Sequence, residues 1–116
     1  LLCKKYRLFP EKEDWAGKIL LLESSEEKMS PEKYRKAVMA LKETGIFDVI
    51  SGILIGKPMD GTYGQEYKQI LVDIIDHPSL PIVCNINIGH AQPRCIIPFG
   101  VEATVDIDHQ VIRFIN

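Results

Sequence analysis

The sequence predicts an α/β domain with a mixed sheet and flanking helices. Three short apolar runs have the length and the β-branched content of buried strands, and they cover residues 18–22, 49–55 and 80–86. Two segments between these runs place apolar residues at helical spacing. Shorter runs near the carboxyl end are separated by turn residues, which favours antiparallel strands. Strands that alternate with helices are typical of parallel sheets, so the antiparallel strands make the predicted sheet mixed.

The first predicted helix begins at Ser30, a capping hydroxyl followed by Pro31 and Glu32. It ends at Gly45. The second helix follows a loop over 56–64 that holds three glycines and a proline. That loop lacks the order of a nucleotide-binding P-loop. Apolar residues at helical spacing mark the two helices: Tyr34, Val38 and Leu41 in the first, and Tyr67, Ile70, Leu71 and Ile74 in the second.

The carboxyl-terminal part is predicted to contain a loop and three short strands. A strand over 95–99 follows the loop, although Pro98 would remove one ladder hydrogen bond and place this strand at an edge. Residues 102–108 alternate between apolar and polar, and residues 111–115 return as the second strand of a hairpin.

Composition and charge place the chain among ordinary soluble globular proteins. It has 116 residues, enough for one modest core, with 46% hydrophobic and 26% charged residues. The net charge of −2 gives no attraction for nucleic acid or for an anionic membrane. No apolar stretch is long enough to span a bilayer, and no signal peptide is visible.

The cysteines favour a reducing compartment. The chain has three cysteines, an odd number, and none of them form a C-x-x-C pair: they are Cys3, Cys84 and Cys95. This pattern predicts reduced thiols in a cytoplasmic protein. A metal site built from Cys84, His90 and Cys95 is an alternative, but the spacing fits no common zinc pattern and one ligand would be missing.

Two residues are candidates for proton-transfer chemistry. His90 lies between Gly89 and Ala91 in the predicted loop, where rigid elements on both sides would place it. Glu23 ends the first strand, at the sheet edge where α/β folds usually bind ligands. Spacing alone favours the simpler interpretation, in which His90 is a surface histidine in a turn and Glu23 marks the exit of the strand into solvent. Glu26 and Glu27 are predicted to be solvated loop residues.

Two stretches resemble the LD-carboxypeptidase family of serine peptidases. The first stretch is similar to the closing motif of that family. It contains Gly89-His90, then Pro98-Phe99-Gly100, then the strand Ala103-Thr104-Val105-Asp106. The second is the strand over 17–22 with Glu23 and the residues Ser24-Ser25-Glu26-Glu27, which look most like the microcin C self-immunity branch. The resemblance covers nearly the whole chain but only the carboxyl-terminal half of the family's architecture.

The resemblance implies a domain organisation. Residues 1–16 would be a linker arm from a missing amino-terminal domain, and residues 17–116 would be a swivelling β/β/α-like carboxyl-terminal domain. The chain starts at Leu1 and not at methionine, which suggests a piece of a longer protein. Because members of this family are usually homodimers, the resemblance further implies a homodimer.

The resemblance also implies a function. His90 would be the general base and Glu23 the acid that orients it, while the nucleophilic serine would belong to the missing domain, since no serine here lies in a G-x-S-x-G setting. The substrate would be a small peptide, either a muropeptide or a peptide–nucleotide antibiotic, and no cofactor or metal would be needed. A non-catalytic binding or dimerisation module is the rival interpretation. A large separation between Glu23 and His90 would favour that rival.

Overall fold

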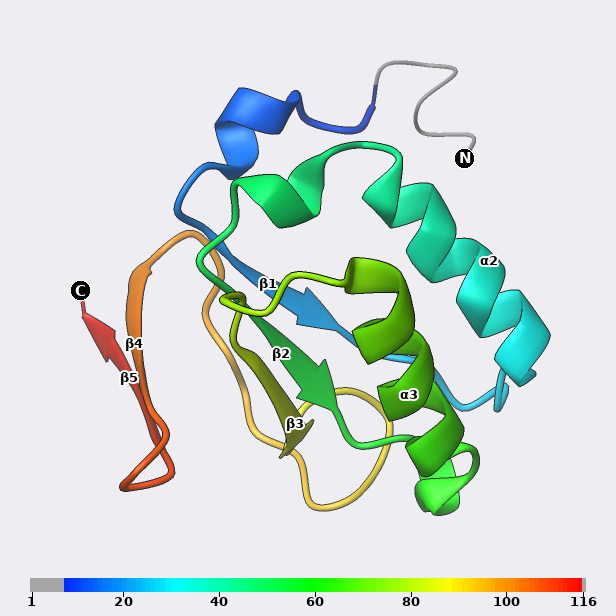
Figure 1. Ribbon diagram of the computed structural model, residues 1–116. Coiled ribbons are helices and arrows are strands. Elements are labelled where there is room, and N and C mark those ends of the chain that lie inside the picture. Colours follow the sequence, from blue (N-terminus) through cyan, green and yellow to red (C-terminus); the bar gives the residue numbers. More distant parts are fainter. Residues whose placement is uncertain (1–7, 116) are drawn as a thin grey trace.

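The computed structural model describes residues 8–115 (Figure 1). Strands and helices alternate along the first three quarters of the chain, and a hairpin follows. In order, these elements are β1 (Ile19–Leu22), α2 (Pro31–Lys42), β2 (Gly52–Gly56), α3 (Gly64–Ile75), β3 (Ile82–Ile86), β4 (Glu102–Asp106) and β5 (Val111–Ile115). Short 3₁₀ turns lie at Lys12–Trp15, Ile46–Asp48 and Met59–Gly61.

The first three strands form a parallel sheet in the order β1-β2-β3. Leu20 pairs with Ile53, and Leu54 pairs with Val83. The strands β4 and β5 form an antiparallel hairpin of their own. The predicted α/β class, with a sheet and flanking helices, is confirmed. The predicted mixed sheet does not form, because the antiparallel strands pair only with each other and the first sheet is wholly parallel.

Both helices cover the same face of the parallel sheet (Figure 1). This follows from the topology, because right-handed connections between strands taken in sequence order place both helices on one side. The aromatic rings of Tyr34 and Tyr67 stack between the helices, with centroids 4.1 Å apart. The core lies here, and Ile46, Ile53 and Leu71 are its most deeply buried large side chains.

The other face of the sheet is turned toward the hairpin and residues 95–99, with two cavities between them. The predicted strand over 95–99 does not form. Pro98 has no N–H to donate, and the Cys95 N–H bonds to the Asn87 carbonyl rather than to a strand. As a result Ile96 is 99% exposed and Phe99 is 81% exposed. An apolar run alone could not distinguish such a surface segment from an edge strand.

The start of the second predicted strand also differs from the sequence-based expectation. The strand predicted from Val49 begins at Gly52, because the backbone N–H groups of Val49 and Ile50 bond to the Ile46 carbonyl at the end of a 3₁₀ turn. Residues 1–7 of the predicted arm lie outside the described residues. Within the rest of the arm, Phe9 and Trp15 contact each other at 5.6 Å between ring centroids and pack against the core.

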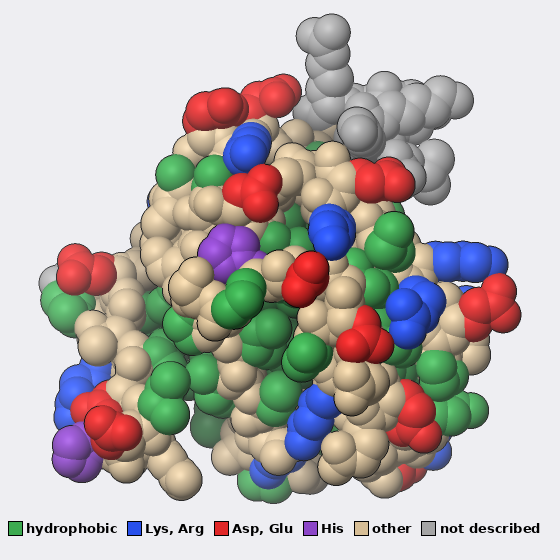
Figure 2. All heavy atoms as spheres, viewed as in Figure 1, with side chains coloured by type: hydrophobic (Ala, Val, Ile, Leu, Met, Phe, Trp, Pro, Cys, Tyr) green, Lys and Arg blue, Asp and Glu red, His purple; other side chains and the backbone are tan. Residues whose placement is uncertain are grey.

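Charges of both signs are interspersed on the face that carries α2 and α3 (Figure 2). No large patch of one sign appears on this face, which agrees with the net charge of −2. Among residues 8–115, no helix has both the length and the apolar character required to cross a membrane.

Candidate active site

The structure brings Glu23 and His90 together although their strands are not neighbours. Glu23 follows β1, His90 lies in the loop after β3, and β2 separates the two strands. The two side chains meet beyond the carboxyl end of β2, the edge at which open α/β sheets bind ligands. The loop after β3 is anchored there by Ile88 and Ala91, which are both buried.

Two glycines make this meeting possible. A Cβ on Gly56, the last residue of β2, would lie 2.8 Å from the Ile88 carbonyl oxygen, so any side chain there would push the loop away. A Cβ on Gly89 would lie 2.2 Å from Cγ of Glu23, and Gly89 has φ +90°. Glycine is therefore required at position 89 for two reasons, a positive φ and the close approach of the Glu23 side chain.

Glu23 holds the imidazole of His90 by a hydrogen bond from Nδ1–H to Oε1. The same Oε1 accepts a hydrogen bond of 2.9 Å from the backbone N–H of Ser25, which fixes the carboxylate. The Glu23 side chain is 28% exposed and the His90 side chain 46% exposed, so the pair lies at the surface. A carboxylate on Nδ1 fixes the tautomer in which Nε2 can accept a proton, as in hydrolase triads.

Glu26 contacts the other side of the same ring. Its Oε2 lies 2.8 Å from Nε2 of His90. Glu26 is a solvated loop residue as predicted, with its side chain 60% exposed, but its contact with His90 was not predicted. The backbone between the two acids turns sharply at Ser25, which has φ 56°. This contact could not be predicted from the sequence, because a positive φ at serine has no clear sequence signal.

The pKa of His90 is raised above 6.5, first by the hydrogen bond to Glu23 and then by the charges of Glu23 and Glu26. Partial desolvation and the charge of Arg94 oppose the increase in pKa. With a carboxylate on each ring nitrogen, both nitrogens can donate at once, which favours the imidazolium. A group that binds a proton this readily, at an exposed sheet edge, can act as a base and then as an acid.

This arrangement predicts which of the neighbouring acids contributes most to the pKa of His90 in the isolated chain. Glu23→Gln is expected to lower the His90 pKa most, and Glu26→Gln is expected to lower it less, because Glu23 supplies both a hydrogen bond and a charge. Titration of the His90 ring by NMR measures both shifts. Glu27→Gln removes a carboxylate from the same loop and is the matched control, expected to leave the His90 pKa nearly unchanged. An equal shift in all three variants would mean that net charge, not contact, sets the pKa.

The raised pKa also fixes a direction for the dependence of folding stability on pH. Because the folded-state pKa lies above the ordinary value of 6.5, the His90 contacts stabilise the fold fully below that value. This stabilisation is lost as pH rises through the folded-state pKa.

The cysteines do not join His90 in a cluster. Within residues 8–115, no group of three or more His, Cys, Asp or Glu side chains is arranged to hold a metal ion. Cys84 is half-buried on β3, where burial raises the pKa of its thiol, and Cys95 is exposed. Cys3 lies outside the described residues.

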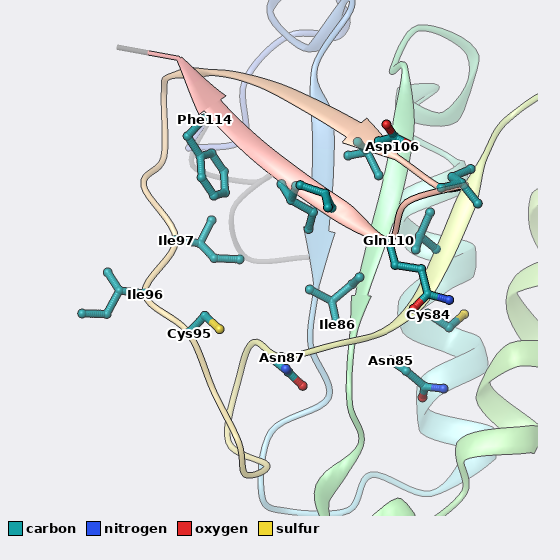
Figure 3. Close-up of a pocket in the computed structure, with 15 residues that line it drawn as sticks. Cys84, Asn85, Ile86, Asn87, Cys95, Ile96, Ile97, Asp106, Gln110 and Phe114 are labelled. Carbon is teal, nitrogen blue, oxygen red and sulfur yellow. The ribbon is translucent and has the colours of Figure 1, made fainter.

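Two cavities flank this part of the fold. The His90 pocket, of about 640 Å³, is lined by residues 57–61 after β2, the first turns of α3, Asn85 and residues 90–92. A hairpin cavity of about 730 Å³ lies between β3, residues 95–97 and the β4–β5 hairpin. In Figure 3, Ile97 and Phe114 point into this cavity, whereas Ile96 points away from it.

The hairpin cavity is largely apolar, and its acid is already engaged. Asp106 accepts hydrogen bonds from the backbone N–H and the ring of His109, and Arg113 lies 3.8 Å away. The candidate base His90 therefore lies at the smaller of these two cavities, the His90 pocket.

A family assignment agrees with this geometry. Residues 1–105 match the family model described as LD-carboxypeptidase C-terminal domain. The chain belongs to this family. It spans less than a third of the length of the curated relatives that it matches.

The relatives of this domain are named either as carboxypeptidases or as a microcin C7 self-immunity protein. It is 28% identical over 101 residues to a Vibrio cholerae protein named as a carboxypeptidase, covering 84% of this chain and 29% of that protein. It is 26% identical over 100 residues to the Escherichia coli microcin C7 self-immunity protein MccF, covering 83% and 28% of the two chains.

A solved structure is similar throughout the domain. The crystal structure of an MccF-like protein from Streptococcus pneumoniae, in complex with AMP, matches with a TM-score of 0.91 and 59% identity. The match covers 97% of this chain and 33% of that one. Two thirds of that protein therefore have no counterpart here.

Proposed function

We propose that this LD-carboxypeptidase domain supplies the glutamate and the histidine of a Ser-Glu-His triad in a serine-type carboxypeptidase or amidase. The hydrogen bond between Glu23 and His90 is the observation that carries the proposal. Two residues 67 positions apart meet at the ligand-binding edge of the sheet, and two glycines are needed for the meeting. A non-catalytic module would need neither the contact nor the glycines, which counts against that rival.

The nucleophilic serine comes from outside this domain. Within residues 8–115, no serine hydroxyl hydrogen-bonds to His90, and Ser25 contributes its backbone N–H to Glu23 instead. The amino-terminal part that the relatives have and this chain lacks would supply the serine. Its hydroxyl would approach Nε2, the position that Glu26 occupies here.

The proposed reaction uses the two nitrogens of His90 in different ways. Nε2 takes the serine proton as the hydroxyl oxygen bonds to the carbonyl carbon of the substrate, while Glu23 steadies the imidazolium through Nδ1. Nε2 then gives this proton to the leaving amine as the C–N bond breaks. Water repeats the sequence to release the acyl group, and His90 returns to its starting state.

The proposed substrate is a small peptide with an anionic end. The branch resemblance of residues 22–27 and the names of two relatives favour a peptide–nucleotide antibiotic of the microcin C kind. The relatives named as carboxypeptidases support a muropeptide as the second candidate. We further propose that the complete protein acts in the cytoplasm as a homodimer.

A reconstitution experiment tests the proposal. This chain replaces the matching third of the Streptococcus pneumoniae MccF-like protein, and the product is called the joined enzyme. The joined enzyme is expected to hydrolyse a peptidyl-adenylate analogue or a muropeptide, and the preferred substrate distinguishes the two candidates. The isolated chain is expected to hydrolyse neither, because the attacking hydroxyl is absent. Robust hydrolysis by the pure isolated chain would contradict the proposed division of the triad.

A further inference from the structure

The His90 pocket contains a second chemical feature besides the histidine. Lys57, directly after β2, and Lys68, in the second turn of α3, both line it. Both lysines are only partly exposed. The backbone N–H of Lys57 bonds to the Ile86 carbonyl at 3.1 Å, which ties this end of the pocket to β3. The lining of the pocket therefore contains two lysines as well as the proposed catalytic base.

Neither charge is neutralised by a neighbour. Within residues 8–115, Lys57 and Lys68 form no ion pair. Asp60 also lines the pocket, but it is paired with Lys28 at 2.7 Å. Cys84 is the ionisable group near Lys68, and because burial raises the pKa of its thiol, the thiol remains neutral. The pocket thus keeps an excess of positive charge in a chain whose net charge is −2.

The backbone adds further donors to the same wall. Gly64 is the first residue of α3 and lines the pocket. Tyr63 precedes it in a left-handed conformation, and no side chain caps the helix. The first N–H groups of an uncapped helix need acceptors, and anions satisfy them well. Two lysines and the first turn of an uncapped helix therefore line one cavity whose volume, about 640 Å³, suits a small ligand.

We propose that the His90 pocket binds the anionic group of the substrate, a carboxylate or a phosphate, through Lys57 and Lys68. The inference rests on the proposed function in one respect, that His90 marks the place of the bond to be cleaved. An enzyme that cleaves near the carboxyl end of a peptide meets a negative charge within a few bonds of the reacting carbonyl. A cationic pocket that shares a wall with the base meets this requirement. The anion has two possible sources, the free carboxylate of a peptide and the phosphate of a nucleotide.

The first test is binding by the isolated chain, which requires no catalysis. Inorganic phosphate and acetate are titrated separately, and amide shifts are followed by NMR. The shifts are expected to centre on Lys57, Gly64 and Lys68. Lys57→Gln and Lys68→Gln are each expected to weaken binding about tenfold, the usual cost of losing one charge-assisted hydrogen bond. Lys36→Gln is the matched control, because Lys36 is a surface lysine paired with Glu32 at 2.8 Å.

The second test uses the joined enzyme. Lys57→Gln is expected to raise KM about tenfold for a substrate that carries the anion, with a much smaller change in kcat. The same variant is expected to change KM little for a substrate whose anion has been replaced by a neutral amide. In the first test, the ratio of the phosphate affinity to the acetate affinity of the isolated chain identifies the source of the anion.

The outcomes separate this inference from the proposed function. Loss of anion binding in both lysine variants, with Lys36→Gln unchanged, supports the pocket even if the joined enzyme is inactive. Shifts spread over the whole surface, or equal weakening in Lys36→Gln, would overturn the pocket even if the joined enzyme hydrolyses peptides.

Discussion

Replacing His90 by alanine is expected to abolish catalytic turnover in the joined enzyme, and Glu23→Gln is expected to lower kcat by as much as ~10⁴-fold. His90 is the only proposed proton carrier, so no group replaces it. Glutamine at position 23 can still occupy the space, but it cannot stabilise the imidazolium and it permits the wrong tautomer at Nδ1. The measurement is steady-state kinetics with the preferred substrate.

The controls for this prediction come from the same loop. Glu27→Gln removes an acid four residues from Glu23 and is expected to keep near-normal kcat. Glu26→Gln removes the contact on Nε2 and is expected to shift the acid limb of the kcat profile to lower pH, because it lowers the pKa of His90. A near-normal rate in Glu23→Gln would show that another group orients His90.

Gly89→Ala is expected to disable the joined enzyme although alanine adds a single methyl group. The new Cβ would lie 2.2 Å from Cγ of Glu23, so the carboxylate or the loop must move. A displacement of about 1 Å at a catalytic group costs roughly 10²-fold in rate, and a loss of at least that size is expected in kcat. The φ of +90° adds a folding cost of about 1–2 kcal/mol, measurable by chemical denaturation.

Gly100→Ala separates the two effects of that substitution. Gly100 also has a positive φ, +72°, but no heavy atom lies within 4 Å of the position of its added Cβ. It is therefore expected to lose a similar amount of stability and to retain activity. Equal losses of activity in both variants would mean that backbone strain, not contact with Glu23, explains the effect of Gly89→Ala.

Much of the fold could be predicted from local sequence signals. Ser30 and Pro31 mark the start of α2, and the Ser30 hydroxyl accepts the Lys33 N–H at 3.4 Å. The fully buried β2 is an unbroken apolar run because helices cover one side and the hairpin region the other. The strand predicted over 95–99 was wrong because composition cannot show whether an apolar segment finds a hydrogen-bonding partner.

The site could be predicted only in part. Glu23 and His90 are identified by a family resemblance, which does not give the order of their strands in the sheet. They meet across β2, and this depends on Gly56, whose missing side chain leaves room for the loop after β3. Glu26, Lys57 and Lys68 were not identified as site residues, because their convergence on His90 or its pocket depends on tertiary structure.

The central claim is that Glu23 acts through His90, and a double-mutant cycle in the joined enzyme tests it most directly. The residual rates of Glu23→Gln, His90→Ala and the double variant are compared with the rate of the unmodified joined enzyme. If the glutamate works only by holding the imidazole, then removing its charge costs nothing further once the imidazole is gone, and the double variant has the rate of His90→Ala alone. If the two losses multiply instead, the residues act independently and the paired assignment is contradicted.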